Sequence, residues 1–219
     1  MNSYAKKLES LKAQPFHKPK EIGDQWQTPK AVAWGLFATF SARLGSIVLD
    51  IFADESNALL PNFYTAKDNA LSKDLAQDLR RIGGTAAFAN PPYSRPFLDE
   101  QGEPVTGMNN ILDWCRVQRG NGAKIILLIK AATSEGWWPD DADFVQFIEG
   151  RITFEKPCWY RAEKEEKSLS AGFPSAVVIF DKHWAWESRP KERLRRDDLI
   201  AQGNVMIEMM SSGAANGDI

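Results

Sequence analysis

The stretch Asn90-Pro91-Pro92-Tyr93 combines residue types that can hold a flat molecule carrying an amino group. Proline fixes φ at about −65° and lacks a backbone donor, so two prolines in succession end a strand at Asn90. The side-chain amide of Asn90 and nearby backbone carbonyls can accept both hydrogens of an exocyclic amine. The ring of Tyr93 can stack on the group that bears the amine. A proline-terminated strand followed by an ordinary loop explains the four residues equally well.

Asp50 and Asp68 are further side chains that could take part in such a site. Asp50 lies near the end of an apolar stretch, residues 47–53, that is typical of a buried strand. Since neighbouring parallel strands open at their carboxyl ends onto one cleft, we expect Asp50 and Asn90 to share a pocket. One would hold a cofactor and the other a substrate amine. A carboxylate at Asp68 could accept a hydrogen bond from a ribose hydroxyl or an adenine amino group, or it could stabilise a turn or a helix N-terminus.

The elements that must position these residues alternate between helix and strand from residue 29 to residue 180. In the first helix, Thr28 is expected as the N-cap and Pro29 as the first helical residue. Helices are expected over residues 29–44, 72–81, 110–119 and 141–147. Strands are expected over residues 47–53, 63–65, 85–90, 123–129, 151–154 and 175–180. The alternation, together with the continuous apolar pattern of the fourth strand, predicts one α/β domain with a mostly parallel sheet.

The composition is that of a globular protein with a core of its own. The 219 residues are 43% hydrophobic and 26% charged, which suits one core but not two ordinary domains. No run of about 18 apolar residues could span a membrane, and the N-terminus lacks a secretory signal, so we expect a cytoplasmic protein. The net charge of −2 means that a nucleic acid would have to bind local basic patches.

The cysteines and histidines show no spacing typical of a disulfide framework or a metal site. Cys115 and Cys158 are the only cysteines, and both are expected to be reduced and buried. His17 and His183 lie far apart in the sequence, and each is expected to be a surface or packing residue. We therefore expect no metal.

Asn-Pro-Pro-Tyr after a hydrophobic strand resembles the catalytic motif of amino-group methyltransferases that use S-adenosylmethionine. The order of the surrounding motifs is similar to that of a narrower group, the phage-type DNA N6-adenine methyltransferases, which are the Dam-like family of bacteriophages and prophages. The resemblance covers about residues 24–182. Its motifs are Trp26-Gln27-Thr28-Pro29, Leu49-Asp50-Ile51-Phe52-Ala53, Asn57-Ala58, Tyr64-Thr65, Asp68-Asn69-Ala70-Leu71, Asn90-Pro91-Pro92-Tyr93-Ser94, Trp137-Trp138, Gly150-Arg151-Ile152-Thr153-Phe154 and Phe173-Pro174-Ser175-Ala176-Val177-Val178.

The resemblance implies a single Rossmann-like methyltransferase domain with a mostly parallel twisted sheet, and it implies roles for particular residues. Asn90 and the carbonyl of Pro91 would accept hydrogen bonds from adenine N6, and Tyr93 would stack on the base; Pro92 completes this catalytic motif. The residues implied to bind S-adenosylmethionine are Trp26, Thr28, Pro29, Asp50, Phe52, Ala53 and Asp68. Among these, Thr28 and Pro29 would hold the cofactor carboxylate, and Asp68 would contact its adenosine.

The segment Asp54-Glu55-Ser56 departs from the family pattern. Larger relatives continue the Asp-x-Phe-Ala sequence with Gly-x-Gly, where the glycines allow the backbone to approach the methionine part of the cofactor. The departure supports one alternative, a non-catalytic DNA-binding protein that retains the fold. A second alternative is an enzyme that methylates a protein glutamine or an rRNA amine, since such enzymes also carry Asn-Pro-Pro-Tyr or Asn-Pro-Pro-Phe. These enzymes share a glycine-rich loop that this chain lacks.

The resemblance makes DNA the expected partner, with an adenine flipped out of the duplex to reach Asn90. Candidate DNA contacts are residues 94–110, residues 156–172 and the basic run 189–196, each of which could equally be solvated. We expect a basic N-terminal arm over residues 1–23, the methyltransferase domain over 24–187 and a charged, partly disordered tail over 188–219. A short or relaxed target specificity is also expected. The resemblance further implies a link to restriction and modification, since the family often protects phage DNA from host restriction. Nothing in the sequence indicates a particular oligomeric state.

Overall fold

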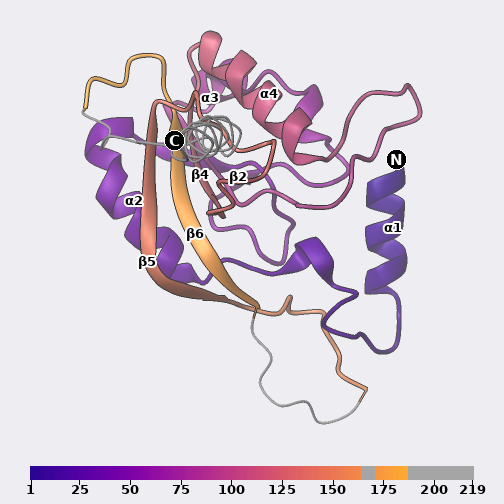
Figure 1. Ribbon diagram of the computed structural model, residues 1–219. Coiled ribbons are helices and arrows are strands. Elements are labelled where there is room, and N and C mark those ends of the chain that lie inside the picture. Colours follow the sequence, from indigo (N-terminus) through magenta and orange to yellow (C-terminus); the bar gives the residue numbers. More distant parts are fainter. Residues whose placement is uncertain (164–170, 187–219) are drawn as a thin grey trace, which may run out of the picture. The chain divides into compact units, whose positions relative to one another are not determined.

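Six strands form one sheet in the computed structural model, which describes residues 1–163 and 171–186. The strand order is β2-β1-β3-β4-β6-β5, and Figure 1 shows β5 and β6 side by side at one edge of the sheet. The parallel part consists of β1 (Ile47–Asp50), β2 (Asn62–Phe63), β3 (Ala86–Ala89) and β4 (Lys124–Lys130). The strand β6 (Ala171–Phe180) runs antiparallel to β4 and to β5 (Phe144–Phe154). The prediction of an α/β fold with a mostly parallel sheet is confirmed, with an antiparallel pair added at one edge.

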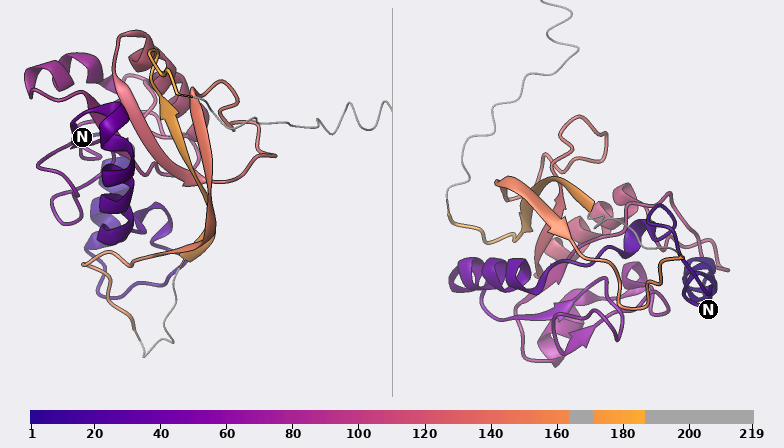
Figure 2. Two further views of the ribbon diagram at one scale, coloured as in Figure 1. Left: turned by 90° about the vertical axis from the view of Figure 1, so that its left-hand side faces the viewer. Right: turned by 90° about the horizontal axis from the view of Figure 1, so that it is seen from below.

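Helices cover both faces of this sheet. On one face, α2 (Lys30–Leu44) packs its Phe37 and Phe40 against strand residues such as Phe88 and Ile126. On the other face, α3 (Leu75–Arg81) and α4 (Met108–Gly120) pack against residues such as Ile125. Successive strand residues point to opposite faces, so β4 needs an apolar residue at nearly every position. Figure 2 shows these layers in two further views.

The predicted helix over residues 141–147 is wrong, because the chain there enters strand β5. Phe144 and Val145 are buried and lie opposite Ile179 and Val178 of β6. This pairing with a distant strand overrides the local pattern. The strand continues through the segment predicted as residues 151–154, with an irregular register around Gly150, whose φ is +81°.

The N-terminal residues fold onto the molecule through α1 (Ser3–Lys12), which lies on the opposite side from α2 in Figure 1 and in the right-hand view of Figure 2. Asn2 and Ala5 of this region are buried, as is Ile22 further along. His17 is also buried and packs against Trp159 and Tyr160, which confirms it as a packing residue.

Cys115 is buried as predicted, whereas Cys158 is exposed, so the prediction is wrong for the second cysteine. Cys158 lies in the loop that follows β5, where turns keep side chains at the surface. No helix within the described residues is long and apolar enough to cross a membrane. The predicted tail over 188–219, the basic run 189–196 and part of the loop 156–172 lie outside the described residues.

Candidate active site

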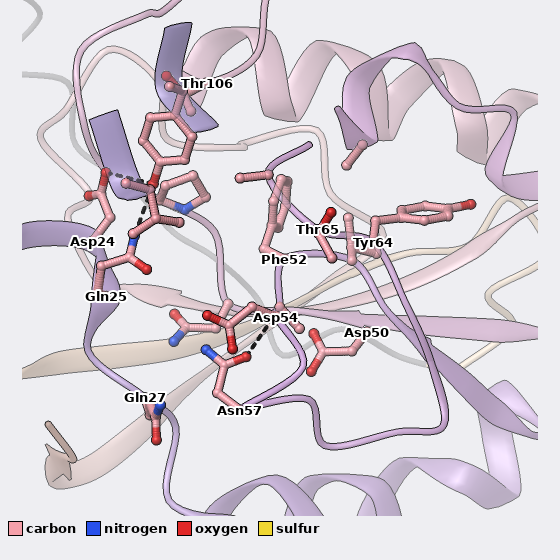
Figure 3. A pocket seen from close by; sticks show the side chains of 18 of the residues that line it. Asp24, Gln25, Gln27, Asp50, Phe52, Asp54, Asn57, Tyr64, Thr65 and Thr106 are labelled. Atoms are coloured by element: carbon pink, nitrogen blue, oxygen red, sulfur yellow. Dashed lines mark hydrogen bonds between the residues drawn. The ribbon is translucent and has the colours of Figure 1, made fainter. Parts of the chain in front are cut away.

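A pocket of about 820 Å³, counted with its part open to solvent, lies where β1 and β3 end. Asp50 from the end of β1 and Asn90 just after β3 both line it. Figure 3 shows Asp24 and Gln25 on one side of the pocket and Thr65 on the other. Of the site residues expected from the sequence, those in the lining are Trp26, Thr28, Asp50, Phe52, Ala53, Asn90 and Pro92. Those outside the lining are Pro29, Asp68, Pro91 and Tyr93.

Asp50 presents a buried carboxyl group to this pocket, with only 3% of the residue exposed. The backbone N–H of Leu59 donates to its Oδ2 at 3.2 Å and so ties the loop after β1 to the strand end. Burial disfavours the charged form and raises the pKa of Asp50 to about 6, against the smaller opposing effect of backbone hydrogen bonds from Leu59 and Phe52. Asp50 is therefore mostly ionised at neutral pH and gains a proton in mildly acidic solution.

Side-chain hydrogen bonds stabilise the loop over residues 54–57, where larger relatives have glycines. The carboxylate of Asp54 accepts from the backbone N–H of Ser56 at 2.8 Å and from Lys12 Nζ at 2.6 Å, and the Asp54 N–H donates to Asn57 Oδ1 at 2.7 Å. Burial acts to raise the pKa of Asp54, but the hydrogen bonds from Lys12 and Ser56 outweigh it and hold this pKa below its usual range. None of Asp54, Glu55 and Ser56 has a positive φ, so the turn does not require glycine.

Asn90 is oriented by a residue far away in the sequence. Its Nδ2 donates to Thr28 Oγ1 at 3.0 Å. The prediction that Thr28 caps the first helix is wrong, because α2 begins at Lys30 and Pro29 occupies the flanking position with no side-chain cap. Pro29 has extended backbone geometry there, so the Thr28 hydroxyl lies one residue too early to cap the helix and bonds to Asn90 instead.

Asp24 is a functional candidate that the sequence did not suggest. Its carboxylate accepts from the backbone N–H of Tyr93 at 2.8 Å and of Ser94 at 3.2 Å. It also lines the pocket, as do Tyr4 and Leu8 of α1. Nothing in the local pattern around Asp24 distinguishes it, since its partners lie 69 and 70 residues away.

Tyr93 lies in an aromatic cluster beside the pocket. Its hydroxyl accepts from the backbone N–H of Lys130 at 2.6 Å, and burial raises its pKa above the ordinary value. The ring packs against Trp137 and Phe173, with centroid distances of 6.0 and 6.3 Å. The ammonium of Lys130 lies 4.3 Å from the Tyr93 ring centroid, so it covers one face of the ring.

Asp68 turns its carboxylate towards Thr65. Its Oδ2 accepts from the Thr65 backbone N–H at 2.8 Å and from the Thr65 hydroxyl at 2.6 Å. Thr65 lines the pocket and Asp68 does not. The hydrogen bonds seen for Asp68 are those of a turn, and its contact with a cofactor stays a prediction.

Comparisons with known proteins agree with this geometry. The family described as DNA N-6-adenine-methyltransferase (Dam) matches residues 16–206. YfdM of Escherichia coli (strain K12), whose name assigns it provisionally to the methyltransferases, is 46% identical over 92 residues, which are 42% of this chain and 96% of YfdM. The DNA N-6-adenine-methyltransferase of Escherichia phage T1 is 28% identical over 119 residues, which are 49% of this chain and 46% of the phage protein.

The fold and the pocket define an α/β protein whose candidate ligand site lies at the carboxyl ends of parallel strands, beside an Asn-Pro-Pro-Tyr loop. Because the family match spans most of its length, the chain belongs to the DNA N-6-adenine-methyltransferase (Dam) family. The chain is thereby an adenine-specific DNA methyltransferase of the type found in phages. This membership favours DNA adenine over the protein glutamine and the rRNA amine as the acceptor.

Proposed function

We propose that the chain transfers a methyl group from S-adenosylmethionine to N6 of adenine in DNA, in the cytoplasm of a bacterial host. The observation that carries the proposal is that Asp50 and Asn90, at the ends of neighbouring parallel strands, line one pocket. The catalytic unit would be a Rossmann-like methyltransferase domain over residues 24–187.

The pocket residues fit S-adenosylmethionine. Gln27 Nε2 is buried and has no hydrogen-bond partner among the described residues, so it can donate to the cofactor carboxylate together with the Thr28 hydroxyl. Asp50 can accept from the ammonium or a hydroxyl group, and Phe52 offers an apolar wall. When bound, S-adenosylmethionine supplies an electrophilic methyl group on a sulfonium centre.

Asn90 and Pro91 would act on the adenine amine. This amine is a poor nucleophile because its lone pair is delocalised into the ring. Asn90 Oδ1 and the Pro91 carbonyl would each accept one of its hydrogens, which draws the nitrogen towards tetrahedral geometry and stabilises the positive charge that grows on it. The remaining requirement is that the amine be aligned with the methyl group, so the site needs no strong base.

Tyr93 would stack on the flipped base. Since the Lys130 ammonium lies over its ring, a stacked base would compete with Lys130 for that face or use the other. Arg95 is exposed just after the catalytic motif, and residues 97–105 fold back on themselves through a backbone bridge between Leu98 and Pro104. This loop is the described segment that we propose for phosphate contacts.

Methyl transfer to different acceptors tests the proposal. The protein is incubated with labelled S-adenosylmethionine and, separately, with duplex DNA, RNA or a protein extract. We expect label in DNA, with a loss of about 100-fold or more in Asn90→Ala because a group that stabilises the transition state is removed. Asn121→Ala, at an exposed position after α4, is the matched control and should retain wild-type activity. Label confined to RNA or protein would contradict the proposal.

A further inference from the structure

We propose that residues 24–28, the segment before α2, position residues 90–94, the catalytic loop. Thr28 fixes the orientation of the Asn90 amide, and Asp24 fixes the loop backbone at residues 93 and 94. The inference rests on the proposed function, because it concerns which atom of Asn90 faces the substrate amine. It assigns Thr28 and Asp24 as positioning residues.

The orientation of the Asn90 amide decides whether it can accept a hydrogen bond from an amine. One side of the amide is an acceptor and the other carries two donors, and a rotation of about 180° exchanges them. With Nδ2 bonded to Thr28 Oγ1 at 3.0 Å, Oδ1 is left to accept from the substrate. The reversed amide would place its own donors against the hydrogens of the amine, and neither group would find an acceptor.

Thr28 is suited to this task because it is 8% exposed and lines the pocket. A hydroxyl group has one donor and two acceptor sites. Since Thr28 Oγ1 accepts from Asn90, its own proton is left to donate to an acceptor in the pocket, such as a carboxylate. The Thr28 hydroxyl can therefore bond at the same time to the cofactor and to Asn90, which would bind the substrate amine.

Asp24 restrains the other end of the loop. The N–H groups of Tyr93 and Ser94 are the first backbone donors after the two prolines, and one carboxylate accepts both, at 2.8 and 3.2 Å. The segment itself is anchored to the sheet, because Gln27 and Glu155 exchange both backbone hydrogen bonds, at 2.8 and 2.9 Å. Both ends of the loop are thus tied to one fixed segment.

Two substitutions of Thr28 distinguish its hydrogen bond to the Asn90 amide from the packing of its side chain. Thr28→Val keeps the side-chain volume but removes the hydroxyl, and we expect kcat to fall about tenfold to hundredfold with little change in KM for DNA. Thr28→Ser restores the hydroxyl and should recover most of the activity. Thr39→Val is the matched control, since Thr39 is an exposed threonine of α2 whose hydroxyl donates to the Gly35 carbonyl of the same helix, and this variant should leave kcat unchanged.

A measurement on the free full-length protein tests the inference apart from activity. In the wild type, the Asn90 Nδ2 protons should exchange slowly with solvent and show an NMR shift that changes in Thr28→Val and returns in Thr28→Ser. Unchanged amide signals in Thr28→Val, or a wild-type kcat in that variant, would overturn the inference. An active wild type whose Thr28→Ser variant is as impaired as Thr28→Val would also overturn it. If the wild type methylated no DNA while the amide signals changed as stated, the proposed function would fail and the positioning by Thr28 would stand.

Discussion

At the scale of single residues, Asp50 places a buried carboxyl group in the pocket. Its burial raises the pKa from the ordinary value of 3.8 to about 6. When the pKa of an acid is higher in the folded protein than in the unfolded chain, its contribution to the free energy of unfolding is largest at pH values below the unfolded-state pKa. This contribution is lost as the pH rises through the folded-state pKa. For Asp50 the loss between about pH 4 and pH 7 amounts to about 2–3 kcal/mol.

Replacing Asp50 by Asn removes this titration. We expect the free energy of unfolding of Asp50→Asn, measured relative to the wild type, to increase by about 2–3 kcal/mol from pH 4 to pH 7. Urea denaturation at several pH values measures this difference. Asp113→Asn is the control, because Asp113 is exposed in α4, where its carboxylate lies largely in water. Parallel pH curves for wild type and Asp50→Asn would show that Asp50 is not the buried acid described above.

The contrast between Asp50 and Asp24 shows what the sequence could predict about the site. Asp50 and Asn90 were predictable because each ends an apolar strand, and parallel strands that are neighbours open onto one cleft. Asp24 and the role of Thr28 were not, since both depend on contacts with residues more than 60 positions away. Thr28 even matched a different local pattern, that of a helix N-cap, which the structure does not use.

At the scale of elements, α1 forms part of the pocket wall. Tyr4 and Leu8 line the pocket, and Lys12 bonds to Asp54 in the loop that follows β1. Further contacts join this helix to two loops, since Asn2 Nδ2 donates to the Ala66 carbonyl at 2.6 Å and Ser3 Oγ donates to the Leu98 carbonyl at 2.9 Å. The predicted basic arm is therefore folded against the site over these residues.

Two lysines of α1 allow a matched test of this contribution. Lys12 pairs with Asp54 of the pocket, whereas Lys6 pairs at 3.0 Å with Glu100, where both side chains are more than half exposed. In Lys12→Met we expect S-adenosylmethionine to bind about tenfold more weakly, because the loop loses an anchor and Asp54 is left half-buried without its cation. Lys6→Met should bind like the wild type. Titration calorimetry measures both affinities, and equal affinities in the two variants would exclude a role for α1 in holding the loop.

Elements with a continuous local pattern were predicted well, and those defined by distant pairing were not. The apolar face of α2 and the apolar run of β4 were both visible in the sequence. The segment from Phe144 onward carries apolar residues that suit a helix as well as a strand, and only its pairing with β6 decides between them. The part of the pocket wall that α1 forms could not be predicted either, because the polar sequence of α1 resembles that of a solvated terminus.

At the scale of the whole molecule, Met1–Glu187 form one unit that contains the sheet, its helices and the pocket. With a net charge of −2, the protein must bind DNA through local groups such as those beside the pocket. Since the described residues contribute no second domain to read flanking bases, we propose a short target sequence. Sequencing of methylated genomic DNA measures this, and methylation confined to one site of about six or more base pairs would contradict it.

The chemical identity of the methylated nucleoside tests the central claim most directly, because cytosine N4 is also an exocyclic amine that Asn90 could hold. Genomic DNA without adenine methylation is incubated with the protein and S-adenosylmethionine, digested to nucleosides and analysed by mass spectrometry. We predict N6-methyl-2′-deoxyadenosine with the wild type, and none above background with Asn90→Ala. Methyl groups at cytosine N4, or unmodified DNA despite bound cofactor, would contradict the assignment of Asn90 and its pocket to adenine N6.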